Sequence, residues 1–365
     1  MTTHEQSWDD KSPLAETLPG QLDAYQHQPL FRIREKGKFG FINAEGHIVV
    51  EPQYNEVEDF QNGFARVHFN NRWVAMDSLG RLLMKHVFNH VGRFSEGLAP
   101  VRLVHRWGYM DRRGNIAIEV QFQAAGNFSE QLACVQHHGA WGYINPQGKW
   151  VIKPQFETAG IFQNGLAPAE LEGLFGYINP EGQWAIAPQF ERALPFQSET
   201  AVVFVQGRWG LVDKGGNLLV PPLLDWVDDE TSGRPFEDRI LMVRGGRYGY
   251  LDGSGETVIP PLFEWAGNFS EGYALMSTDG RYGYMNANGH PVIDPHYEQA
   301  GAFGNGLAPV RAGGQWGYID RTQKVVIPVQ FEQAAPFQNG LAWVERNGRW
   351  GYVDPTGNLV WEEEY

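Results

Sequence analysis

Carboxylates are concentrated in one short stretch of the chain, residues 224–236, which also contains a tryptophan. The residues concerned are Asp225, Trp226, Asp228, Asp229 and Glu230. Such a cluster attracts a basic peptide or a hard cation, because its negative charges lie close together. The spacing lacks the regular order of a calcium-binding loop. We therefore favour a solvated acidic loop and keep the binding of a basic peptide or cation as the alternative.

Basic residues also share one setting, since each precedes an aromatic residue that recurs along the chain. They are Lys38, Arg72, Arg106, Arg208, Arg247, Arg281 and Arg349. In an otherwise acidic chain, such a row suits the binding of a carboxylate, a phosphate or an acidic glycan. The alternative, which we favour, is that each pairs with a recurring acidic residue, of which there are five: Glu157, Glu191, Glu264, Glu298 and Glu332.

Histidines and catalytic motifs give no comparable signal. His86 and His90 lie four residues apart, but this spacing brings two side chains together on a helix and not on a strand. His137 and His138 fall in a turn, and no third ligand accompanies either pair, so we predict no metal site. No nucleophile elbow, phosphate-binding loop or dinucleotide-binding glycine pattern stands in a strand-to-helix setting. We therefore predict neither a cofactor nor enzymatic activity.

The recurring aromatic residue belongs to a 34-residue unit that is present in ten copies. Its positions, which number the copies from 1 to 10, are Phe39, Trp73, Trp107, Trp141, Phe175, Trp209, Tyr248, Tyr282, Trp316 and Trp350. The one longer interval, of 39 residues, contains the acidic insertion at 224–236. Such a period indicates a tandem repeat architecture. We predict an N-terminal extension over 1–28, poorly ordered or capping, and one repeat domain over 29–365.

Each copy has three short apolar segments separated by two turn signals, which predicts a three-stranded antiparallel meander. The first turn usually contains a Gly, which suits the positive φ of a tight hairpin. The second begins with Asp or Asn in all ten copies, and a Gly follows three residues later in nine of them, Gln323 being the exception. The fold class is therefore all-β, since several Gly and a Pro in each unit would break helices.

In eight copies the recurring residue opens an aromatic-Gly-aromatic triplet, such as Trp141-Gly142-Tyr143. The two rings lie on one face of a strand and the Gly on the other, because strand side chains alternate. A Gly at that position admits the close approach of another backbone or ring. We infer that each aromatic pair packs against the bare Gly backbone of the neighbouring copy and so holds the array together.

The triplet, the Asp/Asn-x-x-Gly turn, the Pro-x-Phe segment and the Phe-x-x-Gly-Leu-Ala segment together resemble the WG repeat, also called the KWG repeat. The resemblance covers about nine-tenths of the chain, from Leu30 to Tyr365. It implies tandem β units, and it implies no shared catalytic residues. Copy 2 departs from the pattern, because Val74 replaces the Gly and His86 stands where Pro is expected. Close packing is therefore in question near Val74.

The copies form either a propeller-like ring or an open curved array. An open array needs polar terminal copies, yet copies 1 and 10 are as apolar as the others, which favours contact between the two ends. Propellers usually have about four to eight blades, which is an argument for the open array. We favour the propeller-like ring and keep the open curved array as the alternative.

Composition and charge limit the partners. The formal net charge of −14 argues against nucleic acid, because a polyanion would be repelled. We find no apolar stretch that predicts a membrane span and no signal peptide, and the single cysteine excludes an intramolecular disulfide. These features favour a cytoplasmic location.

These observations favour a non-enzymatic binding module, or scaffold, that contacts a protein or peptide partner through exposed loops. The first alternative is binding of a carbohydrate or cell-envelope glycan by stacking on tryptophans outside the triplet, which are Trp150, Trp184, Trp226, Trp265 and Trp343. The second is an enzyme at the centre of a ring, which would need polar residues from several copies. In a repeat protein, a site is best sought where the copies differ.

Overall fold

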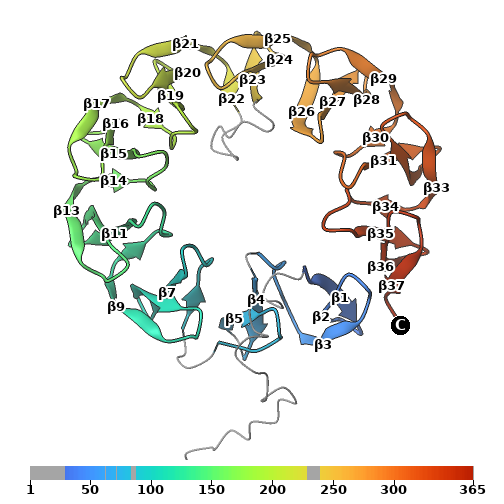
Figure 1. Cartoon of the computed structure of the whole chain (residues 1–365), viewed down its shortest axis with the longest axis horizontal. Coiled ribbons are helices and arrows are strands. Elements are labelled where there is room, and N and C mark those ends of the chain that lie inside the picture. The colour runs from blue at the N-terminus through green and yellow to red at the C-terminus, as the bar shows by residue number, and fades with distance from the viewer. Residues whose placement is uncertain (1–28, 62, 71, 84–87, 228–238, 365) are drawn as a thin grey trace, which may run out of the picture.

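The computed structural model describes residues 29–61, 63–70, 72–83, 88–227 and 239–364, and every element within them is a β-strand. The strands form ten antiparallel sheets, one for each copy of the repeat: eight sheets have four strands, the first has three and the second has two. Figure 1 shows the sheets following one another around a ring. The all-β tandem fold is therefore confirmed.

The strands of the first five copies are as follows. Copy 1 contains β1 (Phe31–Glu35), β2 (Lys38–Ile42) and β3 (Ile48–Tyr54), and copy 2 contains β4 (Phe64–Phe69) and β5 (Arg72–Asp77). Copy 3 contains β6 (His90–Val91), β7 (Leu98–Leu103), β8 (Arg106–Asp111) and β9 (Ile116–Phe122). Copy 4 contains β10 (Ala124–Ala125), β11 (Ala133–His137), β12 (Ala140–Ile144) and β13 (Trp150–Phe156). Copy 5 contains β14 (Thr158–Ala159), β15 (Ala167–Leu171), β16 (Leu174–Ile178) and β17 (Trp184–Phe190).

The strands of the other five copies repeat this order. Copy 6 contains β18 (Arg192–Ala193), β19 (Thr200–Val205), β20 (Arg208–Asp213) and β21 (Leu218–Leu224), and copy 7 contains β22 (Trp226–Val227), β23 (Ile240–Arg244), β24 (Arg247–Leu251) and β25 (Thr257–Phe263). Copy 8 contains β26 (Trp265–Ser270), β27 (Tyr273–Thr278), β28 (Arg281–Asn286) and β29 (Pro291–Tyr297). Copy 9 contains β30 (Gln299–Ala300), β31 (Leu307–Ala312), β32 (Gln315–Asp320) and β33 (Val325–Phe331). Copy 10 contains β34 (Gln333–Ala334), β35 (Ala342–Arg346), β36 (Arg349–Val353) and β37 (Leu359–Glu362).

The prediction of three strands per copy was wrong by one in eight copies, because a further strand precedes the three apolar segments. In copy 4 this strand is β10, whose Ala124 and Ala125 pair with Gln136 and Val135 of β11. Seven of these strands have two residues, too few to produce an alternation of apolar and polar positions, and the eighth, β26, has six. These short strands lie toward the ring centre, and the last strands of the copies, such as β13, β17 and β33, lie on the outside (Figure 1). We call the short strand the inner strand.

The second turn forms as predicted and also joins neighbouring copies. In copy 4 the Asn145 side-chain oxygen accepts the amide hydrogens of Gln147 and Lys149, at 3.1 and 3.0 Å. Gly148 has a φ of 73°, and a Cβ built on it would lie 3.1 Å from Ile118 of copy 3. The Gly is thus required both by the left-handed backbone and by the outer strand of the preceding copy.

The Gly of the aromatic triplet has a different role from the predicted one. A Cβ on Gly142 would lie 2.6 Å from the Ile152 carbonyl oxygen, which belongs to β13 of the same sheet. The register of β12 and β13 shifts on both sides of Tyr143, so the outer strand bulges toward the Gly. The bare backbone therefore accommodates the outer strand of its own copy, and the predicted approach of a neighbouring copy at this Gly was wrong.

In copy 4 the second ring of the triplet reaches the neighbouring copy. Tyr143 is fully buried, packs edge-on against Phe162 of copy 5 at 4.8 Å, and donates a hydrogen bond of 2.8 Å to the Gly160 carbonyl. Trp141 is half-buried and pairs with Phe156 of its own sheet. The predicted packing between copies is thus supplied by the tyrosine, because it points into the junction, whereas the tryptophan covers its own sheet.

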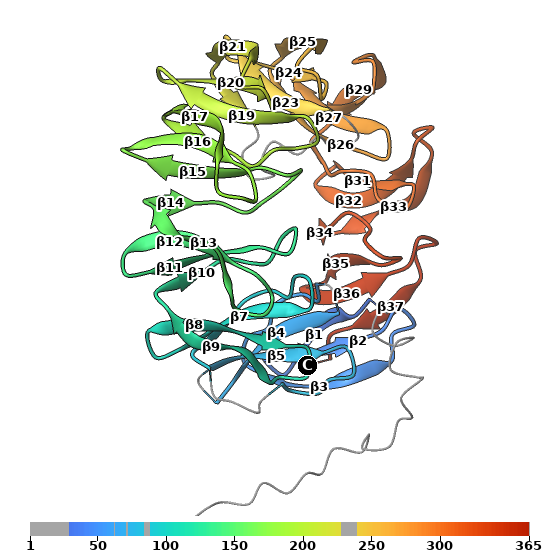
Figure 2. The ribbon, with the colours of Figure 1, turned by 60° about the vertical axis from the view of Figure 1, so that its left-hand side comes forward.

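The two ends of the array meet, as a propeller-like arrangement requires and an open array does not. A Cβ on Gly46 of copy 1 would lie 2.6 Å from the Val360 carbonyl oxygen of copy 10, which repeats the contact between Gly148 and copy 3. Phe31 packs edge-on against Tyr352 at 5.5 Å, and Arg34 forms an ion pair with Glu363 at 3.1 Å. Figures 1 and 2 both show β1–β3 beside β36 and β37. No strand pairing joins these two sheets in the described part, so side chains and turns make this seam.

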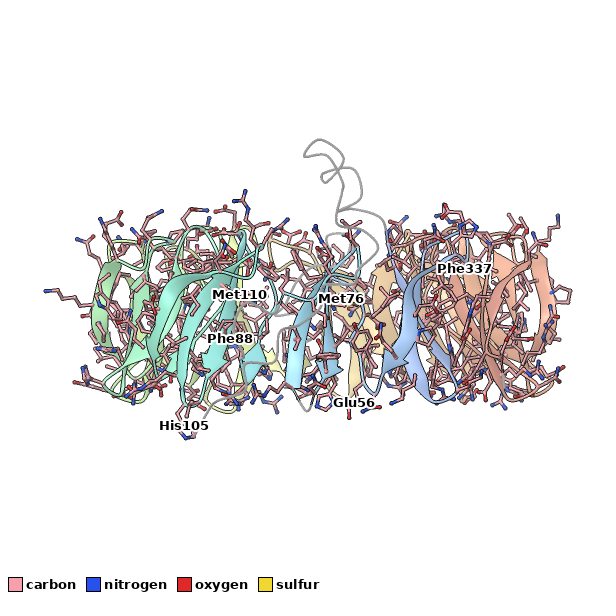
Figure 3. All side chains as sticks on the ribbon, turned by 90° about the horizontal axis from the view of Figure 1, so that it is seen from below. Glu56, Met76, Phe88, His105, Met110 and Phe337 are labelled. Carbon is pink, nitrogen blue, oxygen red and sulfur yellow. The ribbon has the colours of Figure 1, made fainter. Side chains whose placement is uncertain are left out.

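Seen edge-on, the ring is flat (Figure 3), with Glu56 and His105 at one face and Phe337 nearer the other. Among the residues that the structure describes, no helix has the length and apolar character needed to cross a membrane. The N-terminal extension predicted over 1–28 lies outside the described residues.

Candidate functional site

The acidic stretch is only partly described, because Asp228, Asp229 and Glu230 lie outside the described residues. Asp225 forms an ion pair with Arg208 of copy 6 and accepts the Gly246 amide hydrogen at 3.2 Å. These two partners, Gly246 first, lower the pKa of the Asp225 carboxyl. Trp226 lies in β22 and packs against the core cluster of copies 7 and 8. Both described residues are thus engaged within the fold.

The basic row is divided between ion pairs and other contacts. Arg208 pairs with Asp225, Arg247 with Glu264 at 3.8 Å, and Arg349 with Glu362 at 3.7 Å, while Lys38 contacts Asn55. Within the described residues, no ion pair joins Arg72, Arg106 or Arg281 to the recurring acids.

The five recurring acids instead cap the first turns of their own copies. Glu157, directly before β14, accepts the amide hydrogens of Glu172 and Gly173 at 3.0 and 3.1 Å. Glu298 does the same for Gly313 and Gly314 in copy 9. The predicted pairing of basic row and acids therefore holds for Arg247 and Glu264, and turn capping explains why the acid recurs.

The histidines do not assemble a metal site in the part of the chain that is described, where no group of three potential ligands occurs. His86 lies outside that part, and the rings of His137 and His138 contact each other at 4.1 Å. His90 instead contacts an arginine of copy 2, as described below.

A groove of about 520 Å³ lies at the seam between copies 10 and 1. This volume is within the range of roughly 300–1,000 Å³ that is typical of ligand sites. Five of its thirteen lining residues are aromatic, and residues of copies 2 and 10, such as Asp59 and Gln338, form part of its edge. The lining residues used below are Phe31, Arg32, Asp59, Phe60, Trp343, Trp350 and Tyr352. We call this feature the seam groove.

The aromatic walls of the seam groove are held in place by other side chains. The Trp343 and Trp350 rings meet at 5.6 Å and 88°, and the Arg34 guanidinium lies 4.5 Å from the centre of the Trp350 ring. Cation–π contact of this kind fixes the ring orientation. Arg32 and Asp59 form an ion pair of 3.6 Å at the groove, and Asp59 is 70% exposed. The groove therefore offers apolar surface with one exposed charge of each sign.

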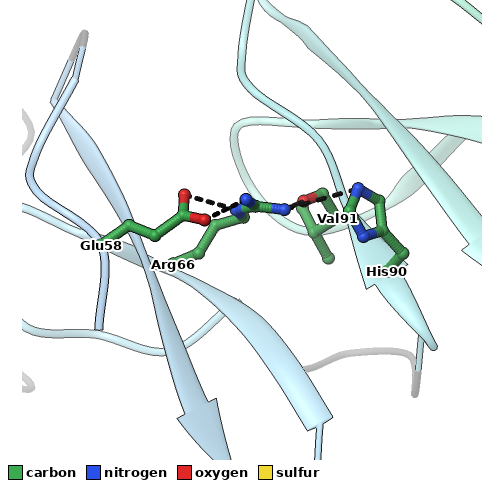
Figure 4. Close-up of polar contacts among 4 residues, drawn as sticks. All are labelled: Glu58, Arg66, His90 and Val91. Atoms are coloured by element: carbon green, nitrogen blue, oxygen red, sulfur yellow. Dashed lines mark hydrogen bonds and ion pairs between the residues drawn. The ribbon is translucent and has the colours of Figure 1, made fainter. Parts of the chain in front are cut away.

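A second group of charged residues adjoins the groove at the junction of copies 2 and 3 (Figure 4). Arg66 binds both carboxylate oxygens of Glu58, and it donates to the Val91 carbonyl at 3.1 Å and to the His90 ring at 3.4 Å. Desolvation, followed by Arg66 and Arg102, lowers the pKa of His90. Because an arginine only donates, His90 accepts through Nε2 and is uncharged in this contact.

The same junction lacks the tyrosine that fills most of the others. Ala75 takes its place, and Phe64 packs against Phe94 at a ring distance of 4.1 Å. A cavity of about 20 Å³ remains between Ala75, Gly92 and Phe94, enough for about one water molecule. The sequence put close packing near Val74 in question. Only a small void remains there, because Phe64 occupies most of the space that the tyrosine fills elsewhere.

Of the tryptophans proposed for glycan stacking, only Trp343 lines the seam groove. Trp150 lies on the outer strand β13 against Phe122 and His137, and Trp184 packs on Phe156. Trp265 lies between Tyr248 and Tyr282. These tryptophans belong to different copies around the ring and do not form one surface.

Sequence reasoning missed Arg32, Asp59, Glu58 and Arg66 as a group. A signal was available, because Arg32 and Arg66 stand seven residues before the recurring aromatic, where copies 3, 5 and 9 have Pro100, Pro168 and Pro309. Glu58 and Asp59 stand where most copies have a Gly or another small or uncharged residue. Aligning the copies position by position identifies these deviations. That the deviating residues lie near the seam follows only from the contact between the two ends of the array.

Comparison with solved structures gives a eukaryotic initiation factor at a TM-score of 0.53 and 12% identity, covering 93% of this chain and 96% of that one. PorZ, a surface component of the type-IX secretion system of Porphyromonas gingivalis, gives 0.31 and 10%, covering 93% and 59%. The extracellular domain of a hybrid two component system from B. thetaiotaomicron gives 0.26 and 10%, covering 92% and 57%. The likeness to the initiation factor concerns the fold alone. A search of curated proteins finds no match to the chain.

The sequence model of the WG containing repeat matches nine segments: 39–73, 75–103, 107–139, 141–175, 175–209, 209–234, 248–282, 282–316 and 316–350. These segments cover most of the chain and begin, with one exception, at the recurring aromatic residue. The protein therefore belongs to the WG-containing repeat family.

Proposed function

We propose that this protein is a non-enzymatic binding scaffold that holds a peptide segment of a protein partner in the seam groove. One observation carries the proposal: an aromatic groove of about 520 Å³ at the junction where the two ends of the array meet. Aromatic walls bind extended peptides well, because rigid rings provide apolar contact area at a low cost in conformational entropy. The exposed Asp59 and the neighbouring Arg32 offer a charged anchor of either sign.

The chemistry of the groove supports binding more than catalysis. Its charged lining residues are Arg32 and Asp59, and both are substantially exposed. A general acid or base that works at neutral pH usually has its pKa shifted toward 7 by burial or by a neighbouring charge.

We propose a cytoplasmic location on the grounds of the sequence, with a protein partner that need not be basic.

Glycan binding is the second candidate, because Trp343 and Trp350 both line the groove. Sugar rings stack on exposed tryptophan faces, whereas these two rings meet edge to face at 88°. This geometry leaves one ring to support a sugar and favours the peptide. A glycan array separates the two functions, since a peptide groove gives no sugar signal.

Selection from a display library of random extended peptides, with the full-length chain as bait, tests the peptide proposal. Selected peptides should lose affinity at least tenfold for Trp343→Ala, because truncating a central aromatic hot-spot residue costs about 2 kcal/mol or more of binding. Trp150→Ala is the matched control, since Trp150 lies on the outer strand β13 and is 38% exposed. Peptides that bind all three proteins equally, or the absence of any groove-dependent peptide, would refute the proposal.

A further inference from the structure

Inner strands are held by the same two backbone hydrogen bonds in six sheets. In copy 4 the Gly126 amide donates to the Cys134 carbonyl and the Gln123 amide to the Gln136 carbonyl, both at 2.8 Å. The corresponding bonds recur in copies 3, 5, 6, 9 and 10. Each inner strand thus uses two carbonyls of the following strand, which lie seven and five residues before the recurring aromatic.

The first sheet has these two acceptors but no described inner strand. The repeat places Arg32 and Arg34 of β1 at the two positions, and the first sheet contains only β1, β2 and β3 in the described residues. The Arg32 carbonyl accepts the Tyr352 hydroxyl at 2.9 Å, and a carbonyl oxygen has a second lone pair. Phe31, Arg32 and Tyr352 also line the seam groove. The groove therefore runs along the edge of β1. In other copies, an inner strand covers the corresponding edge.

The first turn of copy 1 has no cap within the described residues. In copies 3 to 10, a residue directly before the inner strand accepts a turn amide, as Glu157 and Glu298 do. In copy 1 the turn comprises Lys36 and Gly37, and Lys36 and Lys38 place two positive charges there. An acidic residue of an incoming strand would accept those amides and match that charge.

The ring required at this junction is already present. In copy 5, Phe162 follows the inner strand and packs on Tyr143 of copy 4. At the seam, Phe31 packs on Tyr352 instead, where most copies have an alanine at the position of Phe31. An incoming segment is therefore not required to supply an aromatic residue at that point, and the other inner strands indicate a first residue that caps the turn and a small third residue.

We propose that the partner segment binds as the fourth strand of the first sheet, with the pattern Glu-x-Ala-Gly. This proposal rests on the proposed function of the seam groove and specifies its ligand. The amides of the first and fourth residues donate to the Arg34 and Arg32 carbonyls, and the Glu side chain caps the Lys36–Gly37 turn. The chain itself uses this pattern at Glu157–Gly160, Glu264–Gly267 and Glu298–Gly301.

A partner segment fits this register better than the chain's own sequence. At the corresponding positions the chain has Gln21, Leu22, Asp23 and Ala24, all of which lie outside the described residues. This sequence lacks the Glu and carries an acid where the pattern has Ala. Strand addition to an exposed sheet edge is an established mode of peptide recognition, in which main-chain bonds give affinity and side-chain positions give specificity.

The test uses the full-length chain and the capped hexapeptide Glu-Gln-Ala-Gly-Ala-Phe, which has the sequence of residues 298–303. Affinity is measured by calorimetry. N-methylation of the fourth residue removes a required donor and should weaken binding at least tenfold. N-methylation of the third residue, whose amide points away from β1, is the matched control and should change affinity less than threefold. Replacing Glu by Gln should weaken binding about fivefold to tenfold, because a charged cap is lost.

The outcomes separate this inference from the proposed function. Peptides selected through Trp343 that tolerate N-methylation at every position would leave the seam groove as a binding site and overturn strand addition. Failure of the hexapeptide to bind would also overturn it. Binding that appears only in the variant Ala24→Pro would assign the groove to the chain's own N-terminal segment and exclude a partner strand.

Discussion

The Tyr352 hydroxyl donates a hydrogen bond of 2.9 Å to the Arg32 carbonyl, which lies 320 residues away in the sequence. At the junction of copies 4 and 5, the equivalent Tyr143 donates to the Gly160 carbonyl at 2.8 Å. The last copy therefore contacts the first with the same side chain that joins interior copies. The acceptor differs, because Arg32 belongs to β1 whereas Gly160 directly follows an inner strand.

Removing the Tyr352 hydroxyl should destabilise the seam as much as removing the Tyr143 hydroxyl destabilises an interior junction. We expect Tyr352→Phe and Tyr143→Phe each to lower the free energy of unfolding by about 1 kcal/mol, since each leaves one buried carbonyl without its donor. Chemical denaturation of both variants and the unmodified chain measures this. If Tyr143→Phe lowered the free energy of unfolding and Tyr352→Phe left it unchanged, the Tyr352 hydrogen bond would not be what holds the ends of the ring together.

Two glycines of copy 4 should respond differently to the same substitution. Gly142→Ala places a Cβ 2.6 Å from the Ile152 carbonyl oxygen, so β13 must move, and we expect a loss of about 2–3 kcal/mol. Gly139→Ala meets no atom within 4 Å but keeps a φ of 85°, so only backbone strain of about 1 kcal/mol is expected. Equal losses in denaturation experiments would contradict the assignment of the triplet Gly to close packing within its own sheet.

Val104 should be replaceable with a gain in stability. It is a β-branched residue with a φ of 57°, and it is 64% exposed in the turn between β7 and β8. Asn347 occupies the same position in copy 10 with a φ of 54°, a conformation that asparagine adopts more readily. We expect Val104→Asn to raise the free energy of unfolding by about 1 kcal/mol. Leu103→Asn is the control, because Leu103 has no positive φ and should give no comparable gain.

Repetition is what made most of this fold predictable, and it also explains what was missed. Asn145 and Gly148 were identifiable as turn residues because their types are dictated locally, by a side-chain acceptor and a positive φ. The inner strand β10 has only two residues and gives no periodic pattern. The seam groove depends on Arg32 and Trp343 coming together across the whole chain, which no local pattern encodes.

Alkaline pH should destabilise the ring through its junction tyrosines. Burial raises the pKa of Tyr352 to about 12 and also raises those of Tyr143, Tyr177 and Tyr284, from an ordinary value of 10.0. Below pH 10 both folded and unfolded chains hold these protons. As the pH rises above 10, only the unfolded chain releases them readily, so stability falls. Denaturation midpoints measured between about pH 8 and 11 should decrease steeply only above 10. A midpoint independent of pH would argue against buried tyrosines.

Cys134 should report the opening of the junction between copies 4 and 5, because it packs in the same buried cluster as Tyr143 and Phe162. It is 5% exposed, and burial raises the pKa of its thiol to about 11, so the reactive thiolate is scarce at neutral pH. It is the single cysteine of the chain, and a Cβ on Gly126 would lie 2.6 Å from its sulfur.

A thiol reagent at about pH 8 should therefore modify the folded chain at least a hundredfold more slowly than the chain in urea, since the pKa difference alone supplies a factor of that order. Tyr143 donates to the Gly160 carbonyl at 2.8 Å, so Tyr143→Phe should speed the reaction by loosening this junction, whereas Tyr318→Phe in copy 9 should not. Equal acceleration by both variants would mean that the ring opens as a whole and not one junction at a time.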